Sequence, residues 1–423
     1  MTCDRWANAI ARRGITVLLA LVALAYVAGM IGHLKLGEGH TLYVGDGFYY
    51  YCYLPSLVLD GDLDFTNQYA LGDANGWGHV GTDTPTAYFG VVGATGRPAN
   101  AWSIGPALLW LPFFLVGLAG DYLLGQGAVN GFGPYSQALT YLGSGVYGGL
   151  GIYLLLYRGL AGFSVRTRTV TMVLLVFGTS LNYYLLLAGQ MSHGLSFFAV
   201  CLFLFCTQAL LRRPDRISAY LLSGLSLGLI ALIRWQDAVL GIMAVFAVVV
   251  ALRQAVSVRV RIAGPLKLVA GLGIAAVIQA VVWQSIYDAP LVIPQGKEWM
   301  TWSDPHLGAV LFSYPHGLFV NSPLLMLGLF GLWSYRKRDA AWAWSSLLTI
   351  AVAVYVCAAV SQWWGGESFG MRRLISVYPL MGFGLAEVLE TAMGRPYAWR
   401  VATAGGAVAG LVWNWNVLLR FLH

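Results

Sequence analysis

Long apolar runs recur from one end of this chain to the other, and they constrain its fold more than any other feature. Runs of about 18 or more apolar residues are typical of membrane-spanning segments. Because the bilayer core holds no water, each span must satisfy its own backbone hydrogen bonds, so we expect these runs to be helices. Segments of about ten residues with alternating polarity, typical of a transmembrane barrel, do not occur in the sequence.

The composition excludes a soluble domain. Of the 423 residues, 58% are hydrophobic and only 10% are charged, whereas soluble domains carry about 25% charged residues. The net charge of +7 comes from short basic loops between apolar runs, which indicates membrane topology and not nucleic-acid binding. The five cysteines have neither metal-ligand nor disulfide spacing. We therefore expect residues 1–423 to form one polytopic, all-α integral membrane domain.

Twelve apolar segments are the candidate spans. They cover approximately residues 14–32, 101–124, 135–157, 169–187, 195–211, 218–233, 238–252, 268–287, 310–333, 341–360, 374–391 and 400–419. Three arginines precede the first segment, as in a signal peptide, but the segment is long enough to span and no small-residue cleavage site follows it. We interpret it as a retained helix with a cytoplasmic N-terminus.

Basic clusters set the expected orientation, because cytoplasmic loops are enriched in Lys and Arg. Six clusters hold 18 of the 25 Lys and Arg residues: Arg5/Arg12/Arg13, Arg158/Arg166/Arg168, Arg212/Arg213/Arg216, Arg253/Arg259/Arg261/Lys267, Arg336/Lys337/Arg338 and Arg395/Arg400. All fall on one side only if one early segment does not cross. We expect 101–124 to be interfacial or re-entrant, because Pro106, Pro112 and Asp121 interrupt it, which leaves about eleven or twelve transmembrane helices.

Polar residues concentrate on the side opposite the basic clusters. The stretch 33–100, predicted to be a long external first loop, holds seven of the 18 acidic residues. Two further external loops are predicted at about 288–310 and 361–373. Loops on a rigid scaffold commonly carry function, so we expect the functional site on this face.

The first candidate in these loops is Asp46, which lies between Gly45 and Gly47 and before a run of tyrosines. A carboxylate at the membrane surface is poorly solvated, and burial raises the pKa of a carboxyl group, which makes it a better base. The alternative is a structural turn followed by tyrosines of the interfacial belt.

A second acidic motif follows in the same loop. Asp60, Asp62 and Asp64 alternate with apolar residues or glycine. Alternating carboxylates can hold a divalent cation through oxygen ligands. The alternative, which we favour, is a set of aspartates that cap helices. No metal ligand is assigned.

Paired arginines occur in the third external loop, against the positive-inside rule. Trp363, Trp364 and Glu367 precede Arg372 and Arg373. Arginine binds phosphate oxygens through two parallel hydrogen bonds, and tryptophan stacks on sugars. A salt bridge from either arginine to Glu367, with interfacial tryptophans, explains the motif equally well.

Three smaller polar signals map to the same face. They are His193 at the end of one span, Arg234 beside Asp237 between two spans, and His316 at the start of another. Each has a structural explanation, such as a local Arg–Asp pair. Ionisable residues at membrane depth are nevertheless costly, so they are candidates for function. A carboxylate base, arginines for an anion and aromatic rings on one face together predict a transferase with a phosphate-bearing lipid donor.

Several motifs resemble one known group of membrane enzymes. They are Gly45-Asp46-Gly47, Pro55-Ser56-Leu57, Asp60-Gly61-Asp62-Leu63-Asp64, Asn67-Gln68-Tyr69, His316-Gly317-Leu318-Phe319 with Ser322-Pro323, and Trp364-Gly365-Gly366 with Arg372. Together with a first helix, a long loop and a multispan body, they resemble the GT-C superfamily of polyprenyl-phosphate-sugar-dependent glycosyltransferases. That superfamily includes protein mannosyltransferases and lipid A aminoarabinose transferases. One departure is that Gly47 stands where similar bacterial proteins have glutamate.

The resemblance implies an inverting glycosyltransferase. Asp46 would be the base, and the candidate substrate-binding residues are Arg372, Arg373, His193, Arg234, His316, Asp60, Asp62, Trp363, Trp364 and Glu367. It further implies a polyprenyl-phosphate sugar donor, a glycan, lipid or protein acceptor, no obligatory cofactor, and a location in the bacterial inner membrane. The alternatives are a polymerase or ligase of lipid-linked glycans, a transporter or flippase for a lipid-linked or anionic substrate, and a non-catalytic scaffold.

Overall fold

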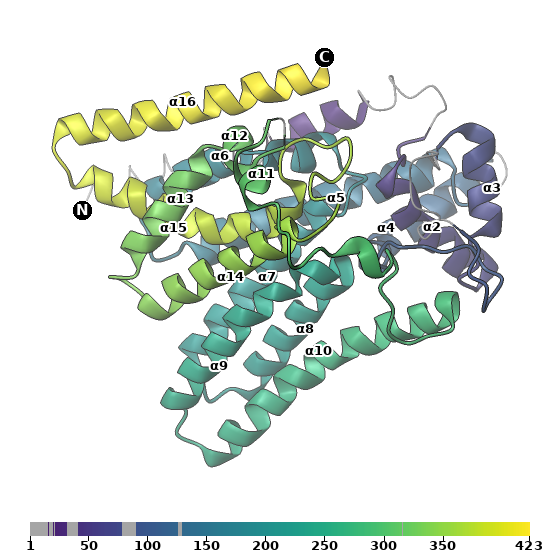
Figure 1. Cartoon of the computed structure of the whole chain (residues 1–423), viewed down its shortest axis with the longest axis horizontal. Helices are drawn as coiled ribbons and strands as arrows, with labels where there is room; N and C mark the ends of the chain where they lie inside the picture. Colours follow the sequence, from purple (N-terminus) through teal and green to yellow (C-terminus); the bar gives the residue numbers. More distant parts are fainter. Residues whose placement is uncertain are drawn as a thin grey trace.

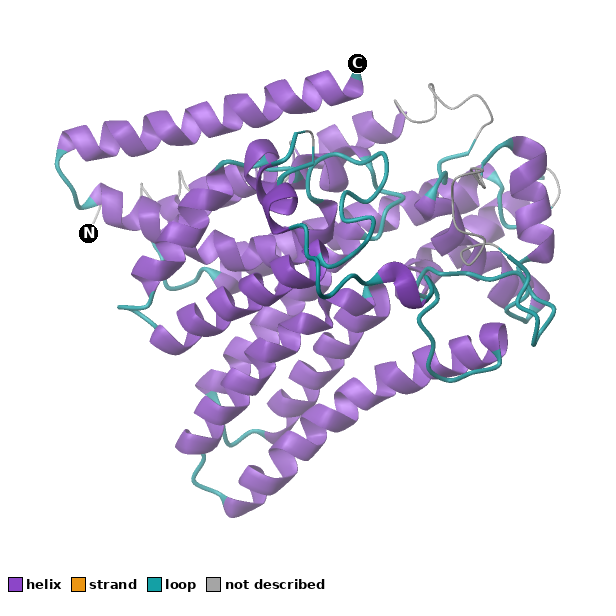
Figure 2. Cartoon of the chain, viewed as in Figure 1, coloured by secondary structure: helices purple, strands orange, loops and turns teal. Residues whose placement is uncertain are grey.

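The chain folds into helices that are packed side by side, as expected for an all-α membrane protein (Figure 1; Figure 2). The computed structural model describes residues 16, 20, 22–31, 41–77, 90–125, 129–314 and 316–423. Within these ranges, the only β-type pairings are two isolated bridges, Val91 with Pro98 and Met300 with Val360. The helices are α2 (Asp46–Pro55), α3 (Thr66–Asn75), α4 (Gly105–Leu123), α5 (Pro134–Leu154), α6 (Val165–Phe177), α7 (His193–Arg212), α8 (Ile217–Ile233), α9 (Gly241–Gln254), α10 (Val258–Tyr287), α11 (Leu307–Phe312), α12 (Leu318–Asn321), α13 (Leu324–Tyr335), α14 (Ala340–Ala358), α15 (Tyr378–Met393) and α16 (Tyr397–Leu422).

Seven helical segments in the described part of the chain are long and apolar enough to cross a membrane. They are Gly105–Leu123, Pro134–Gly159, His193–Arg212, Trp235–Gln254, Val258–Tyr287, Ala340–Ala358 and Arg372–Met393. Three shorter apolar helices are Val22–Ile31, Ile217–Ile233 and Leu324–Tyr335. The prediction of an integral membrane fold is confirmed. The three basic residues before the first apolar run lie outside the described residues.

Helix α4 differs from the interrupted segment that we expected at 101–124. It is continuous, because Pro106 lies in its first turn, where no backbone N–H is needed. Pro112 also lies within the helix without ending it. The buried Asp121 accepts hydrogen bonds from the backbone N–H groups of Tyr135 and Ser136, both at 2.9 Å. It therefore caps α5. The prediction that Pro106, Pro112 and Asp121 interrupt this segment was wrong.

The apolar segment 310–333 is not one helix, contrary to expectation. It divides into α11, α12 and the start of α13. Pro323 has no backbone N–H and therefore cannot continue the preceding turn, so α13 begins immediately after it. The predicted first loop differs in the opposite sense, because α2 and α3 occupy much of its described part. Residues 32–40 and 78–89 of that loop lie outside the described ranges.

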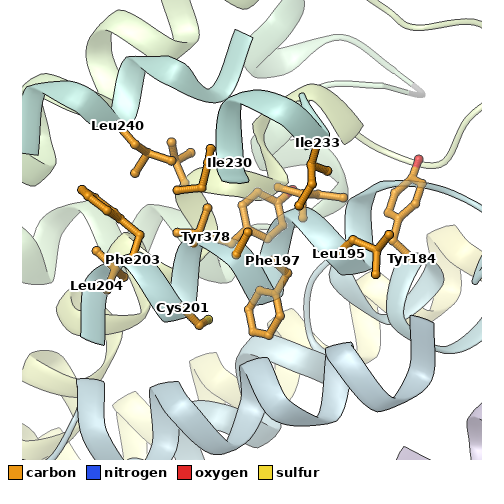
Figure 3. Packing of buried hydrophobic residues seen from close by; sticks show 14 of the residues in the cluster. Tyr184, Leu195, Phe197, Cys201, Phe203, Leu204, Ile230, Ile233, Leu240 and Tyr378 are labelled. Atoms are coloured by element: carbon orange, nitrogen blue, oxygen red, sulfur yellow. The ribbon is translucent and has the colours of Figure 1, made fainter. Parts of the chain in front are cut away.

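Helix α7 is the centre of the core. Leu195, Phe197, Phe203 and Leu204 are fully buried between neighbouring helices (Figure 3). Around it lie α5 and α8, whereas α16 runs along one edge of the molecule (Figure 1). Lipid chains are as apolar as leucine, so close van der Waals packing stabilises such a core more than transfer from water does. The same packing fixes the start of α7, where His193 lies.

Glycines let pairs of helices approach closely. A Cβ atom added at Gly271 of α10 would lie 2.7 Å from the backbone of Leu221 in α8. One added at Gly328 of α13 would lie 2.8 Å from the carbonyl oxygen of Met381 in α15. Small residues at contacts of this kind are typical of membrane helix pairs.

Candidate active site

A cavity of about 320 Å³ lies where several helix ends meet two long loops. Its wall is formed by the start of α2, the residues before α4, the start of α7, the break between α8 and α9, and parts of the loops after α10 and α14. The lining residues are Gly45, Asp46, Tyr49, Tyr50, Ala101, Trp102, Ser103, Ser192, His193, Ile233, Arg234, Trp235, Gln236, Gln295, Trp299, Gln362, Gly365, Gly366, Arg372 and Arg373. Helix ends and loops, and not helix middles, therefore supply its chemistry.

Asp46 and Arg372 form an ion pair in this cavity. Nη1 of Arg372 donates to Oδ2 of Asp46 at 2.7 Å, and the side chains are 15% and 29% exposed, respectively. Asp46 is the first residue of α2, and Gly45 before it has φ = 54°, a conformation that favours glycine. The side chain of Arg372 lies against Gly365, where φ is +75°. The sequence prediction named both charged residues, but it did not pair them.

A second ion pair lies behind the cavity wall. Nε of Arg234 is 3.7 Å from Oδ2 of Asp237, as the sequence suggested. Asp237 also accepts hydrogen bonds from the hydroxyls of Ser196 and Ser376, both at 2.8 Å. Nη1 of Arg234 donates to the backbone carbonyl of Arg372 at 3.2 Å. The pair is buried, so it holds the loop of Arg372 against α7 and α8.

Arg373 has no ion pair among the described residues. Its guanidinium lies over the ring of Trp299, 5.2 Å from the ring centre. Nη2 donates weakly to the carbonyl of Gln362 at 3.3 Å, and Nε is buried without a hydrogen-bond partner. The loop that carries Trp299 is tied to the end of α14 by a hydrogen bond from the N–H of Ser361 to the carbonyl of Trp299.

His193 begins α7 at the wall of the cavity. It is 4% exposed, and neither ring nitrogen has a hydrogen-bond partner. Its ring packs on Tyr184, with the ring centres 4.5 Å apart. The neighbouring Ser192 donates to the hydroxyl of Tyr50 at 3.1 Å. Burial raises the pKa of Tyr50, so its phenol stays protonated at physiological pH.

Aromatic rings form another part of the wall. Tyr49 and Trp102 stack with their centres 4.3 Å apart and their planes 11° apart. Asn100 holds this arrangement, because its amide donates to the carbonyl of Tyr49 and accepts from the N–H of Trp102. Trp235 and Trp299 also line the cavity. Such faces stack well on the apolar side of a sugar ring. Trp102, Trp235 and Trp299 were not predicted for the site, because only the tertiary fold brings them to the cavity.

Six residues predicted for the site do not line the cavity: Asp60, Asp62, His316, Trp363, Trp364 and Glu367. Asp60 accepts hydrogen bonds from the side-chain amides of Asn67 and Gln68. Asp62 accepts from the hydroxyl of Ser56 and the N–H of Asp64. These bonds hold the loop before α3 together, but neither aspartate caps that helix, because its N-cap is Phe65 and makes no side-chain cap bond. The rings of His316 and Trp363 lie edge to face, with their centres 6.4 Å apart.

The described residues contain no group of three or more His, Cys, Asp or Glu side chains placed to hold a metal ion. Asp46 is the one carboxylate among the lining residues, and it is already bound to Arg372. The cavity is therefore lined by three arginines and one carboxylate.

The fold has known counterparts among membrane glycosyltransferases. No family model and no curated protein matches the sequence. The structural neighbours are oligosaccharyltransferases, so the predicted likeness to membrane glycosyltransferases is confirmed at the level of the fold alone.

Two solved structures illustrate the likeness. One is the archaeal oligosaccharyltransferase AglB from Archaeoglobus fulgidus in complex with an inhibitory peptide and a dolichol-phosphate. It has a TM-score of 0.53 and 13% identity, with 95% of this chain and 55% of that chain covered. The other is the Archaeoglobus fulgidus oligosaccharyltransferase in complex with Zn and sulfate, with a TM-score of 0.52 and 15% identity, covering 94% of this chain and 52% of that chain. The chain thus spans about half the length of the structures it matches.

Proposed function

We propose that this protein is an inverting glycosyltransferase that moves a sugar from a polyprenyl-phosphate-linked donor to an acceptor hydroxyl or amide, with Asp46 as the general base. The observation that carries the proposal is the cavity that combines the Asp46–Arg372 pair, two further arginines and an aromatic wall. One of the structural neighbours was solved with a dolichol-phosphate and a peptide. The dolichol-phosphate bound to that neighbour supports the choice of a lipid-phosphate donor.

The proposed reaction gives separate roles to Asp46 and to the arginines of the cavity. The acceptor attacks the anomeric carbon and loses its proton to Asp46, while the bond from that carbon to the phosphate oxygen breaks on the opposite face. The configuration is thereby inverted, and the phosphate leaves with the bonding electrons. Arg372 binds Oδ2 of Asp46, and Oδ1 has no partner among the described residues, so Oδ1 is the oxygen that accepts the proton. The guanidinium groups that line the cavity stabilise the charge on the leaving phosphate.

The proposed setting is the bacterial inner membrane, with the N-terminus in the cytoplasm and the cavity on the external face. The sugar is a hexose or a pentose, and the acceptor is a glycan, a lipid or a protein. The alternatives are a polymerase or ligase of lipid-linked glycans and a transporter or flippase, neither of which needs Asp46 as a base.

The test is a glycan profile of cells that lack the protein, complemented with the wild type, Asp46→Asn or Asp73→Asn at matched expression. Asp73 is an exposed carboxylate on α3 outside the cavity, so it controls for loss of charge. We expect the wild type and Asp73→Asn to restore a missing sugar. We expect Asp46→Asn to reduce the product by about 100-fold or more, in line with the contribution of a general base.

Full complementation by Asp46→Asn would contradict the assignment of the base and would favour the transporter, ligase or scaffold. Thermal unfolding of each purified variant in detergent shows whether a loss of product reflects loss of the fold.

A further inference from the structure

A second cavity lies between α7 and α8, at the end of α7 that is remote from the candidate active site. Its volume is about 330 Å³, within the range of about 300–1,000 Å³ that is typical of ligand pockets. Helix α7 runs for 20 residues from His193, at the candidate active site, to Arg212, at this second cavity. A helix of that length spans about 30 Å, roughly the thickness of the hydrocarbon core. The second cavity therefore lies on the side that the basic clusters predict to be cytoplasmic.

The second cavity carries positive charge that its own lining does not compensate. Its lining contains no acidic side chain but three exposed arginines: Arg212, Arg213 and Arg216. In the described part of the chain, none of the three forms an ion pair. The acidic residue within the same loop, Asp215, does not line the cavity, and it accepts a hydrogen bond from the N–H of Val256 at 3.1 Å. The positive-inside rule explains why these arginines are on this side, but not why they surround a cavity.

The start of α8 adds to this positive charge. The N-terminus of a helix carries a partial positive charge, so acidic residues are favourable in its first turn and arginines are not. Helix α8 has no acidic residue there, and Arg216 before it makes no side-chain cap bond. Ser218 of the first turn lines the cavity. Arg212 differs, because it lies in the last turn of α7, where a positive charge is favourable. An anion bound at the start of α8 would offset the charges of Arg213 and Arg216.

The rest of the lining is mostly apolar. It includes Phe205 and Ala209 of α7 and Leu222 of α8. Leu222 is 52% exposed on an apolar helix, as expected for a side chain that faces lipid. The cavity thus combines a cationic part with an apolar part that borders the lipid-facing surface. An inorganic anion would use only the first part, whereas a phospholipid has a phosphate and acyl chains for both.

We propose that this cavity binds the headgroup of an anionic phospholipid, with the phosphate at Arg213, Arg216 and the start of α8 and the first acyl carbons against Phe205 and Leu222. Arginine binds phosphate oxygens through two parallel hydrogen bonds. The cytoplasmic leaflet carries anionic lipids, and basic pockets between membrane helices bind their headgroups. The site shares no lining residue with the candidate active site, so it does not depend on the proposed function.

The test is equilibrium binding of dihexanoyl-phosphatidylglycerol, a short-chain anionic phospholipid, to the full-length protein in a neutral detergent. Two further probes separate the parts of the ligand. Dihexanoyl-phosphatidylcholine has the same acyl chains and a phosphate but no net charge, and inorganic phosphate has no acyl chains. We expect the wild type to bind phosphatidylglycerol at least about tenfold more tightly than either probe.

The double variant Arg213→Gln/Arg216→Gln should raise the Kd for phosphatidylglycerol by about tenfold or more, because each basic residue near an anionic headgroup contributes to binding. Lys337→Gln/Arg395→Gln is the matched control, since it removes the same charge from exposed positions in other basic loops outside the cavity. Its Kd should stay within about threefold of the wild type. Ala209→Phe keeps all three arginines but fills the cavity, so it should weaken binding as well.

Equal loss of affinity in the two double variants would overturn the proposal, because binding would then reflect general attraction to basic loops. Equally tight binding of phosphatidylcholine or of inorganic phosphate would overturn it too, as would wild-type affinity in Arg213→Gln/Arg216→Gln or absence of wild-type binding. Thermal unfolding shows whether each variant folds. If the glutamine variant does not fold, Arg213→Lys/Arg216→Lys replaces it. That variant keeps the charge but loses the paired hydrogen bonds, so we expect an affinity below that of the wild type, and an unchanged Kd would overturn the proposal.

Discussion

At the scale of single residues, glycines determine where the charged groups of the cavity lie. Gly47, the one departure from the motif that this loop resembles, has no room for a side chain. A Cβ atom there would lie 2.7 Å from Cγ and 2.9 Å from Cβ of Gln190. The departure is therefore a packing requirement in this chain, since Gln190 occupies the space that a longer side chain would need.

We predict that Gly47→Ala lowers stability by about 1–3 kcal/mol, as is usual when an atom is forced into a filled space. The start of α2 must shift, so Asp46 moves with it and sugar transfer falls. Thermal unfolding in detergent and the glycan profile measure the two effects.

The matched control is Gly149→Ala in α5, because a Cβ atom at Gly149 has no neighbour within 4 Å. It should be neutral or slightly stabilising. Equal stability of the two variants would show that Gln190 does not restrict position 47.

Gly365 constrains the other member of the ion pair. Its φ is +75°, and a Cβ atom there would lie 2.8 Å from Nε of Arg372. Gly365→Ala should therefore displace the guanidinium from Asp46 and reduce transfer by at least about tenfold, besides the strain of about 1–2 kcal/mol for alanine in this conformation. Gly366→Ala has a similar φ of +74° but no atom within 4 Å. It should show only the strain, so equal loss of activity in both variants would contradict the prediction.

At the scale of elements, Asp121 links α4 to α5. Its carboxylate accepts hydrogen bonds from the N–H groups of Tyr135 and Ser136 and from the hydroxyl of Ser136. Asp121 is 4% exposed. A negative charge at a helix N-terminus is favourable, so the residue that looked like an interruption of a span stabilises the next helix.

We predict that Asp121→Ala lowers the free energy of unfolding by about 2–3 kcal/mol, because a buried cap and its charge are lost together. Asp121→Asn should lose less, since its amide oxygen still accepts. Unfolding of both variants in detergent, with Asp73→Ala as the exposed control, measures the difference. If Asp121→Ala unfolds like the wild type, the cap does not stabilise α5.

The helical class and the location of most helices follow from apolar runs, because a bilayer leaves the backbone no other solution. Helix breaks are less predictable. The division of 310–333 into three pieces depends on how Gly317 and Pro323 pack. Glycine and proline also occur inside other helices of this chain, so their presence alone does not predict a break. Asp46, Arg234, Arg372, Arg373 and His193 were predicted for the site from their charge or from their position beside spans. Trp102 and Trp299 were not, because only the tertiary fold brings Trp102 to α2 and Trp299 to the turn that precedes α15.

At the scale of the whole molecule, the orientation in the membrane can be tested with single cysteines. Cys52, Cys201, Cys206 and Cys357 are buried, and Cys3 lies outside the described residues, so a Cys3→Ser background should label little. We predict that Asp73→Cys reacts with a membrane-impermeant maleimide in intact spheroplasts, because α3 lies on the side proposed as external.

Lys337→Cys, in the basic loop between α13 and α14, should react only after the membrane is permeabilised, as the positive-inside rule predicts. Both positions are exposed, so accessibility does not distinguish them. The reverse pattern would place the cavity on the cytoplasmic side.

The ion pair of the cavity also has a consequence for biogenesis. Asp46 and Arg372 are 326 positions apart in the chain, and ribosomes deliver the N-terminal partner first. During synthesis, the segment with Asp46 therefore waits until nearly the whole chain has been inserted before its partner arrives. Arg373 arrives at the same late stage. A chain whose synthesis stops before residue 372 has neither guanidinium group, so an incomplete product cannot form the ion pair or complete the cavity wall.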